Sequence, residues 1–83
     1  MIQELDQSDI DFLDHLANMT RCTVCLPPFK NKNHVFIDIS IVKNSKFLLE
    51  NISLAMIEYG FSFVFDEDGF IEILGVTHGT AKL

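Results

Sequence analysis

Two cysteines, Cys22 and Cys25, stand three residues apart in the stretch TRCTVCLPPFK, residues 20–30. This spacing occurs in redox-active dithiols and in many zinc sites, where a tight turn brings both sulfurs together. The intervening Thr23 and Val24 are β-branched and favour a strand instead. In a strand, residues three apart point to opposite faces and lie about 10 Å apart, too far for a disulfide, which needs less than about 7 Å. We therefore expect a buried Cys22, an exposed Cys25, no metal and no cofactor.

A zinc-binding or thiol-active small domain is the alternative that this motif leaves open. It would recruit His34 with either His15 or His78, because one cysteine pair supplies only half of a four-ligand zinc site. The Asp-Glu-Asp-Gly stretch at residues 66–69 resembles part of a calcium loop but lacks the closing glutamate. A hairpin turn with Gly69 in the left-handed conformation explains the same residues. No nucleophile is paired with a base and no glycine-rich phosphate loop is present, so we expect no catalytic residues and no enzyme.

The chain is both acidic and apolar, with a net charge of −6 and 48% hydrophobic residues among 83. The acidic balance argues against direct nucleic-acid binding, which depends on Lys and Arg. The sequence contains neither an apolar run of about 18 residues nor a signal peptide, so we expect a cytoplasmic protein without membrane contact. The length allows one domain, residues 1–83, whose core is too small to bury all of the apolar side chains. The surplus predicts a protein partner or a homodimer.

The hydrophobic pattern predicts two helices. Residues 8–19 should form the first, with Ser8 as its cap and Asp11 completing a capping box. Residues 44–59 should form the second, capped by Asn44 or Ser45 and ended by a left-handed Gly60. The second helix carries one apolar stripe for the core and further apolar residues on another side, Phe47, Leu54 and Ile57. A helix that is apolar on two sides is usually buried on two sides.

Four segments alternate with a period of two and are predicted as strands: residues 20–26, 34–42, 61–65 and 70–76. The first two pair best when Leu26 faces Val35, Val24 faces Ile37 and Cys22 faces Ile39. In the second hairpin, Phe61, Phe63 and Phe65 line up with Ile71 and Ile73.

The order αββαββ predicts an α+β two-layer sandwich, a four-stranded antiparallel sheet with both helices on one face. One solution resembles a ferredoxin-like sandwich whose first strand has moved to the C-terminus, which places residues 34–42 and 70–76 in the centre. A simple meander is the alternative. The resemblance concerns architecture alone and implies nothing about function.

This layout leaves one sheet face uncovered, and an acidic rim surrounds it. We expect partner-binding residues of two kinds. The acidic ones are Asp9, Asp11 and Asp14 in the first helix and Asp66, Glu67 and Asp68 in the last turn. The apolar ones on the open face are Phe36, Val64, Phe70 and Leu74.

These observations indicate a small acidic, non-enzymatic protein–protein interaction module that regulates or inhibits a larger protein. In one specific form it is a phage-type antagonist whose carboxylates imitate phosphates and occupy a basic, nucleic-acid-binding groove. A homodimeric structural protein is the alternative, because a second copy would cover the same surplus apolar surface.

Overall fold

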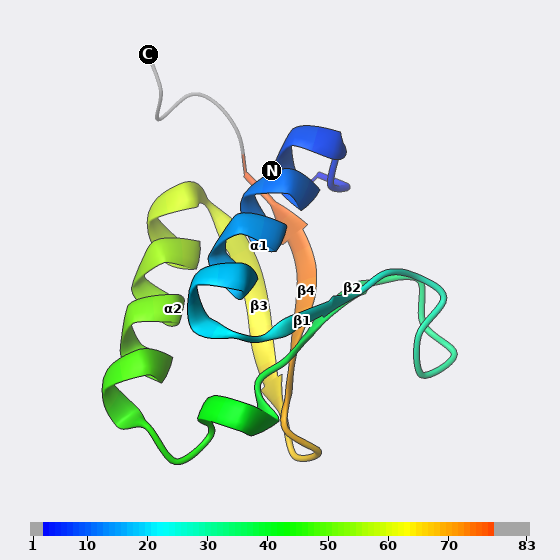
Figure 1. The fold of residues 1–83 in the computed structure, drawn as a ribbon. Helices are drawn as coiled ribbons and strands as arrows, with labels where there is room; N and C mark the ends of the chain where they lie inside the picture. Colours follow the sequence, from blue (N-terminus) through cyan, green and yellow to red (C-terminus); the bar gives the residue numbers. More distant parts are fainter. Residues whose placement is uncertain (1–2, 78–83) are drawn as a thin grey trace.

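The computed structural model describes residues 3–77 and contains two helices packed on one antiparallel sheet (Figure 1). The elements are α1 (Gln7–Thr20), β1 (Thr23–Cys25), β2 (Val35–Asp38), the short 3₁₀ helix η1 (Ser40–Val42), α2 (Lys46–Tyr59), β3 (Phe61–Asp66) and β4 (Phe70–Val76). The strand order is β1-β2-β4-β3. The predicted α+β sandwich is confirmed, with β2 and β4 in the centre as in the rearranged ferredoxin-like order rather than the meander.

The first helix is capped earlier than predicted. Asp6, not Ser8, is the N-cap: its side chain accepts the backbone N–H of Asp9 at 3.0 Å. Asp9 returns the bond by accepting the backbone N–H of Asp6 at 2.8 Å. The Ser8 hydroxyl instead donates to the Asp6 carboxylate at 2.8 Å. The capping box predicted for Ser8 and Asp11 is therefore wrong by two residues. The pair that forms the box is Asp6 and Asp9, which has the same spacing and lies just upstream.

The second helix begins and ends as its sequence predicts. Ser45 caps it by accepting the Leu48 backbone N–H at 3.3 Å, and Gly60 ends it with φ of 112°. Ile52 and Met56 are fully buried against the sheet. Exposed apolar residues lie on the other side of the helix, namely Phe47, Leu54 and Ile57. The prediction of two apolar sides is confirmed.

The first two strands are shorter than predicted, but their register is correct. Val24 pairs with Ile37, the predicted partner. β2 ends at Asp38 because the Asp38 side chain accepts the Ser40 N–H at 2.9 Å and turns the chain into η1. β1 ends at Cys25, and Leu26, which was predicted to face the core, is exposed.

The second hairpin follows its predicted register until one extra residue intervenes. Phe65 pairs with Ile71 and Phe63 pairs with Ile73, but Ser62 pairs with Gly75, so that Leu74 is an added residue in β4. Such a bulge shifts the alternation of faces by one residue. In β4 it brings Val76 rather than Gly75 onto the core side, opposite Phe61, and both Phe61 and Val76 are buried.

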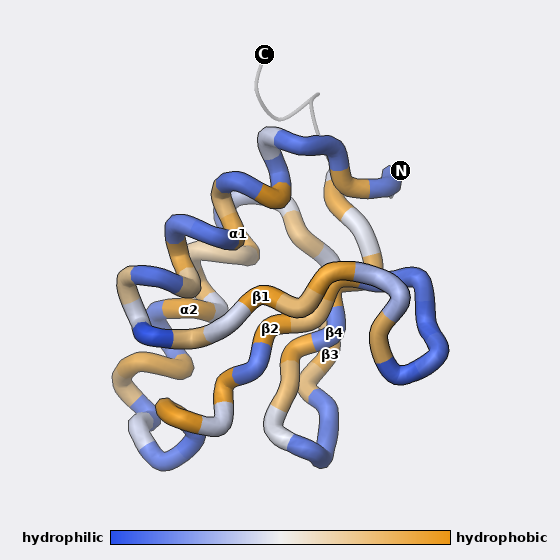
Figure 2. Tube along the Cα trace, turned by 45° about the vertical axis from the view of Figure 1, so that its right-hand side comes forward, coloured by the Kyte–Doolittle hydropathy of each residue, from blue (hydrophilic) through white to orange (hydrophobic). Residues whose placement is uncertain are grey.

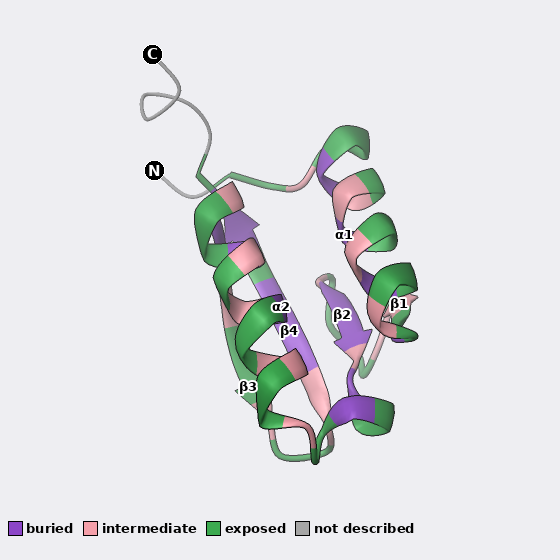
Figure 3. Cartoon of the chain, turned by 60° about the vertical axis from the view of Figure 1, so that its left-hand side comes forward, coloured by how far each residue is buried: buried purple, intermediate pink, exposed green. Residues whose placement is uncertain are grey.

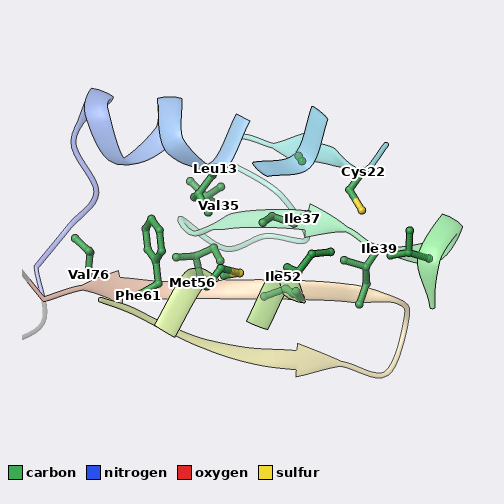
Figure 4. Close-up of a cluster of buried hydrophobic side chains, with 13 residues drawn as sticks. Leu13, Cys22, Val35, Ile37, Ile39, Ile52, Met56, Phe61 and Val76 are labelled. Carbon is green, nitrogen blue, oxygen red and sulfur yellow. The ribbon is translucent and has the colours of Figure 1, made fainter. Parts of the chain in front are cut away.

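The core lies between the sheet and the two helices (Figure 4). Leu13 and Ala17 come from α1, and Ile52 and Met56 come from α2. The central strands supply most of the rest, chiefly Val35, Ile37, Ile71, Ile73 and Val76. β4 is almost wholly buried whereas β3 is largely exposed or half-buried, as Figure 3 shows. Cys22 is buried at the edge of this core, as predicted.

The connection between β1 and β2 contains a small hairpin within residues 27–34, and its turn consists of two residues. Phe29 and Lys32 exchange backbone hydrogen bonds of 2.9 and 3.0 Å. Lys30 and Asn31 at its tip have positive φ of 53° and 62°, which is the geometry of a type I′ turn. The tip is strongly hydrophilic, as is the β3–β4 turn (Figure 2). We call this stretch the 27–34 segment.

Candidate functional site

The sheet face opposite the helices is not open, contrary to the sequence prediction. The Phe29 ring of the 27–34 segment lies 5.0 Å from the ring of Phe36 and 5.2 Å from that of Phe70. Phe36 is consequently only 1% exposed, and Phe70 is half-buried. The prediction that Phe36 is accessible to a partner is therefore wrong. Val64 and Leu74, also on this side of the sheet, are exposed as predicted.

The acidic β3–β4 turn is partly neutralised by the same segment. The Lys30 ammonium lies 2.8 Å from the Asp66 carboxylate and 2.7 Å from that of Asp68, and it also lies over the Phe70 ring. The hydrogen bond from Lys30 lowers the pKa of Asp66. Glu67, between them, is exposed. The turn thus presents less free negative charge than its sequence suggests.

A third contact fixes the base of the segment. Glu72 is only 7% exposed and accepts from Lys32 at 3.2 Å, while its second oxygen lies 2.6 Å from His34 Nδ1. The hydrogen bond with His34 lowers the pKa of the Glu72 carboxyl, and burial opposes that shift. A buried carboxylate is tolerated here because both of its oxygens have partners.

Stability is expected to decline in acid partly through Glu72. Because the folded-state pKa lies below the ordinary value of about 4.3, the contribution is complete above that value and is lost as pH falls through the folded pKa. At pH 7, Glu72→Gln should lower the free energy of unfolding by about 1–2 kcal/mol. Urea denaturation at pH 7 and pH 3 measures this. A wild-type-to-variant difference that stays constant between the two pH values would contradict it.

The acidic residues of α1 divide into two kinds. Asp9 is fully buried and accepts the Tyr59 hydroxyl at 2.9 Å, so the prediction that it lies on a binding surface is wrong. Asp11 and Asp14 are exposed, as expected. The Tyr59 ring also stacks on those of Phe12 and Phe61, which contact each other as well, so that three rings join α1, α2 and β3 at one junction. The buried Asp9 carboxylate therefore has a structural role at this junction.

The two cysteines of the Cys22–Cys25 motif are both free thiols. Cys25 lies half-buried on β1, where burial and the nearby Asp38 carboxylate raise its pKa. A raised pKa keeps a thiol protonated at neutral pH and so lowers its nucleophilicity. Within residues 3–77, no three or more His, Cys, Asp or Glu side chains gather in a way that could hold a metal ion. His78, one of the proposed ligands, lies outside the described residues.

A hollow of about 340 Å³ lies beside the 27–34 segment. Its lining combines the apolar residues Leu5, Ile10, Pro27, Val35, Ile73 and Leu74 with Glu4, Asn33 and His34. The histidine has one ring nitrogen engaged by Glu72, and the lining contains no Ser, Thr or Cys that it could activate. The hollow therefore does not assemble a nucleophile–base pair.

Among the described residues, seven large apolar side chains are more than half exposed, and four of these lie on α2 and the neighbouring edge strand; the others are Met19, Leu26 and Ile41. Leu54 and Ile57 are 57% and 60% exposed, Phe47 on the same side of α2 is 71% exposed, and Phe65 of β3 is 51% exposed. We call these four residues the α2–β3 surface. A groove of about 520 Å³ adjoins it, lined by two of these residues, Leu54 and Phe65, and by Lys46, Leu49, Glu50 and Ser53.

Sequence reasoning found only part of this surface. Phe47, Leu54 and Ile57 were recognisable because they fall off the core stripe of their helix. Phe65 was placed inside, opposite Ile71, and that pairing is correct. Phe65 is nevertheless 51% exposed, on the edge strand β3. No feature of the sequence near Phe65 signals this.

Comparison with protein-family models, curated proteins and solved structures finds no significant match to this chain. Among the described residues, neither helix has the length or the apolar character needed to cross a bilayer.

Proposed function

We propose that this protein is a non-enzymatic interaction module that binds another protein chain through the α2–β3 surface. The observation that carries the proposal is the presence on α2 and β3 of four large apolar side chains, each more than half exposed, two of which, Leu54 and Phe65, line a groove. Isolated exposed apolar residues are ordinary, but contiguous ones commonly mark a binding surface. Aromatic anchors such as Phe47 and Phe65 are enriched in the centres of interfaces.

The apolar surface supports binding better than the acidic residues do. Three of the six acidic residues expected to bind a partner are engaged within the chain: Asp9 in the α1 junction, and Asp66 and Asp68 with Lys30. Asp11, Asp14 and Glu67 are left to steer a basic partner. Exposed charges of this kind mainly raise association rates, whereas affinity depends on desolvated anchors. The proposal of a regulator or inhibitor therefore rests on the α2–β3 surface rather than on phosphate imitation.

The non-enzymatic part of the proposal is supported by the states of the reactive groups. The pKa of Cys25 is raised rather than lowered. One ring nitrogen of His34 is occupied by a buried carboxylate in a contact that fastens the 27–34 segment. The Cys25 thiol is therefore not activated as a nucleophile, and the hollow beside His34 contains no Ser, Thr or Cys that this ring could activate.

Affinity capture with matched variants tests this function. The wild-type protein, Leu54→Asp and Met19→Asp are immobilised and exposed to host lysate, and bound chains are identified by mass spectrometry. Met19 is 70% exposed on α1 and serves as the control for an added surface charge. We expect at least one specific chain that is retained by wild type and Met19→Asp but lost with Leu54→Asp. Equal capture by all three proteins would overturn the assignment of the surface.

A further inference from the structure

The two edges of the sheet differ greatly in their capacity to accept another strand. β1 is three residues long and is followed by Leu26, Pro27 and Pro28; the prolines have no backbone N–H to donate. β3 is six residues long and, among residues 3–77, pairs only with β4, along its inner side. Its sequence, FSFVFD, has no proline or lysine and no charge before Asp66. Natural edge strands usually carry such residues, which prevent pairing with another chain.

We infer that the chain held by the α2–β3 surface is a second copy of this protein, paired antiparallel through β3. This rests on the function proposed above and names its partner. Antiparallel pairing of two identical strands has a two-fold axis perpendicular to the sheet. Because α2 packs against β3 in each copy, the two α2 helices then lie side by side on the same face of one continuous sheet. Their exposed apolar residues, Leu54 and Ile57, would face each other across the axis.

The charges of the surface suit pairing with a copy of itself. Lys46 and Glu50 are the charged residues that line the groove, and their charges cancel. Five of the twelve acidic residues lie elsewhere, in the N-terminal segment and α1: Glu4, Asp6, Asp9, Asp11 and Asp14. Glu58 is exposed on α2, and Asp66 at the end of β3 is paired with Lys30. Repulsion between two α2–β3 surfaces is therefore limited chiefly to Glu58.

The exposed apolar area of this surface is also large enough to contribute to a dimer interface. The α2–β3 surface together with Val64 exposes on the order of 500 Å² of apolar side chain. Each partner in a standard interface contributes roughly 800 Å². The backbone and polar groups along β3 and the groove supply the remainder, and strand addition contributes main-chain hydrogen bonds as well.

Sedimentation equilibrium and amide hydrogen exchange of the whole chain test the pairing. We expect wild type to be a dimer at about 100 μM, a concentration that reveals any complex with Kd of micromolar order. Leu54→Asp and Val64→Lys should each raise the dimer Kd at least about 100-fold, because a two-fold axis places like charges together. Met19→Asp should leave the Kd unchanged. Circular dichroism checks that each variant is folded.

Amide exchange decides whether β3 forms the contact. Outward-facing amides within Phe61–Asp66 should exchange more slowly in the wild-type dimer than in the folded Leu54→Asp monomer. A monomeric wild type, or a dimer whose β3 amides are no better protected than those of the monomer, would overturn the inference. A monomer that still captures another chain in a Leu54-dependent way leaves the proposed function intact. If neither self-association nor capture depends on Leu54, both proposals fail.

Discussion

Replacing Asp9 with alanine is expected to lower the free energy of unfolding by about 3–4 kcal/mol. The carboxylate is fully buried and accepts two hydrogen bonds, from the Asp6 backbone at 2.8 Å and from the Tyr59 hydroxyl at 2.9 Å. The first bond caps α1, and the second ties α1 to the end of α2. The substitution removes both and leaves the partly buried Tyr59 hydroxyl without this acceptor, which itself carries a desolvation cost.

Urea denaturation at pH 7 measures the effect, and two variants calibrate it. Asp11→Ala removes an exposed acid of the same helix, whose carboxylate accepts only a surface bond from Gln7 at 2.9 Å. It should change stability by less than about 0.5 kcal/mol. Tyr59→Phe removes the hydroxyl that bonds to Asp9 but keeps the cap of α1, and it should cost about 1–2 kcal/mol. If Asp9→Ala were no more destabilising than Asp11→Ala, the two hydrogen bonds of the buried Asp9 could not be stabilising the junction between α1 and α2.

Strand pairing was predictable because it depends on local alternation. Shifting β1 against β2 by one residue would oppose Ile37 with a threonine, so only the pairing of Val24 with Ile37 keeps the apolar face continuous. The same reasoning placed Phe65 opposite Ile71. The helix ends were less certain, because Asp6 and Ser8 each have an acidic residue three positions later and both spacings satisfy the capping pattern.

The covering of the outer sheet face could not be predicted, because it depends on contacts between residues far apart in the chain. Phe29 stands among prolines, lysines and asparagines and has no periodic neighbours, so the pattern indicates only a loop. Its packing on Phe36 and Phe70 is decided by the strand order, which brings β2 and β4 together beneath it. The ion pairs of Lys30 and Lys32 join residues 36 to 40 positions apart.

This one segment changes which surface is available for binding. Once Phe29 covers Phe36, the outer face retains only Val64 and Leu74 as exposed large apolar residues in the sheet. The apolar surplus that the composition predicts is then found on α2 and the β3 edge. The composition indicated correctly that such a surplus exists, but only the tertiary structure locates it.

Replacing Gly60 with alanine is expected to lower the free energy of unfolding by at least about 3 kcal/mol, because left-handed strain and overpacking add. Gly60 has φ of 112°, which L residues with a side chain rarely adopt, and its carbonyl accepts the Thr77 backbone N–H at 2.8 Å. A β-carbon at this position would collide with the Thr77 carbonyl oxygen, which belongs to backbone and cannot rotate away.

Gly69→Ala is the matched control, because Gly69 shares the strain without the collision. Its φ is 90°, and the nearest atom to an added β-carbon is the Ser40 β-carbon at 3.8 Å, an ordinary contact. The variant should therefore cost only about 1 kcal/mol. Thermal and urea denaturation of both variants separate the two effects. Equal losses would mean that strain alone operates at Gly60 and that the approach of Thr77 is not rigid. A much larger loss at Gly60 would establish that the α2–β3 connection is held between backbones, which fixes the helix beside the edge strand and so shapes the α2–β3 surface.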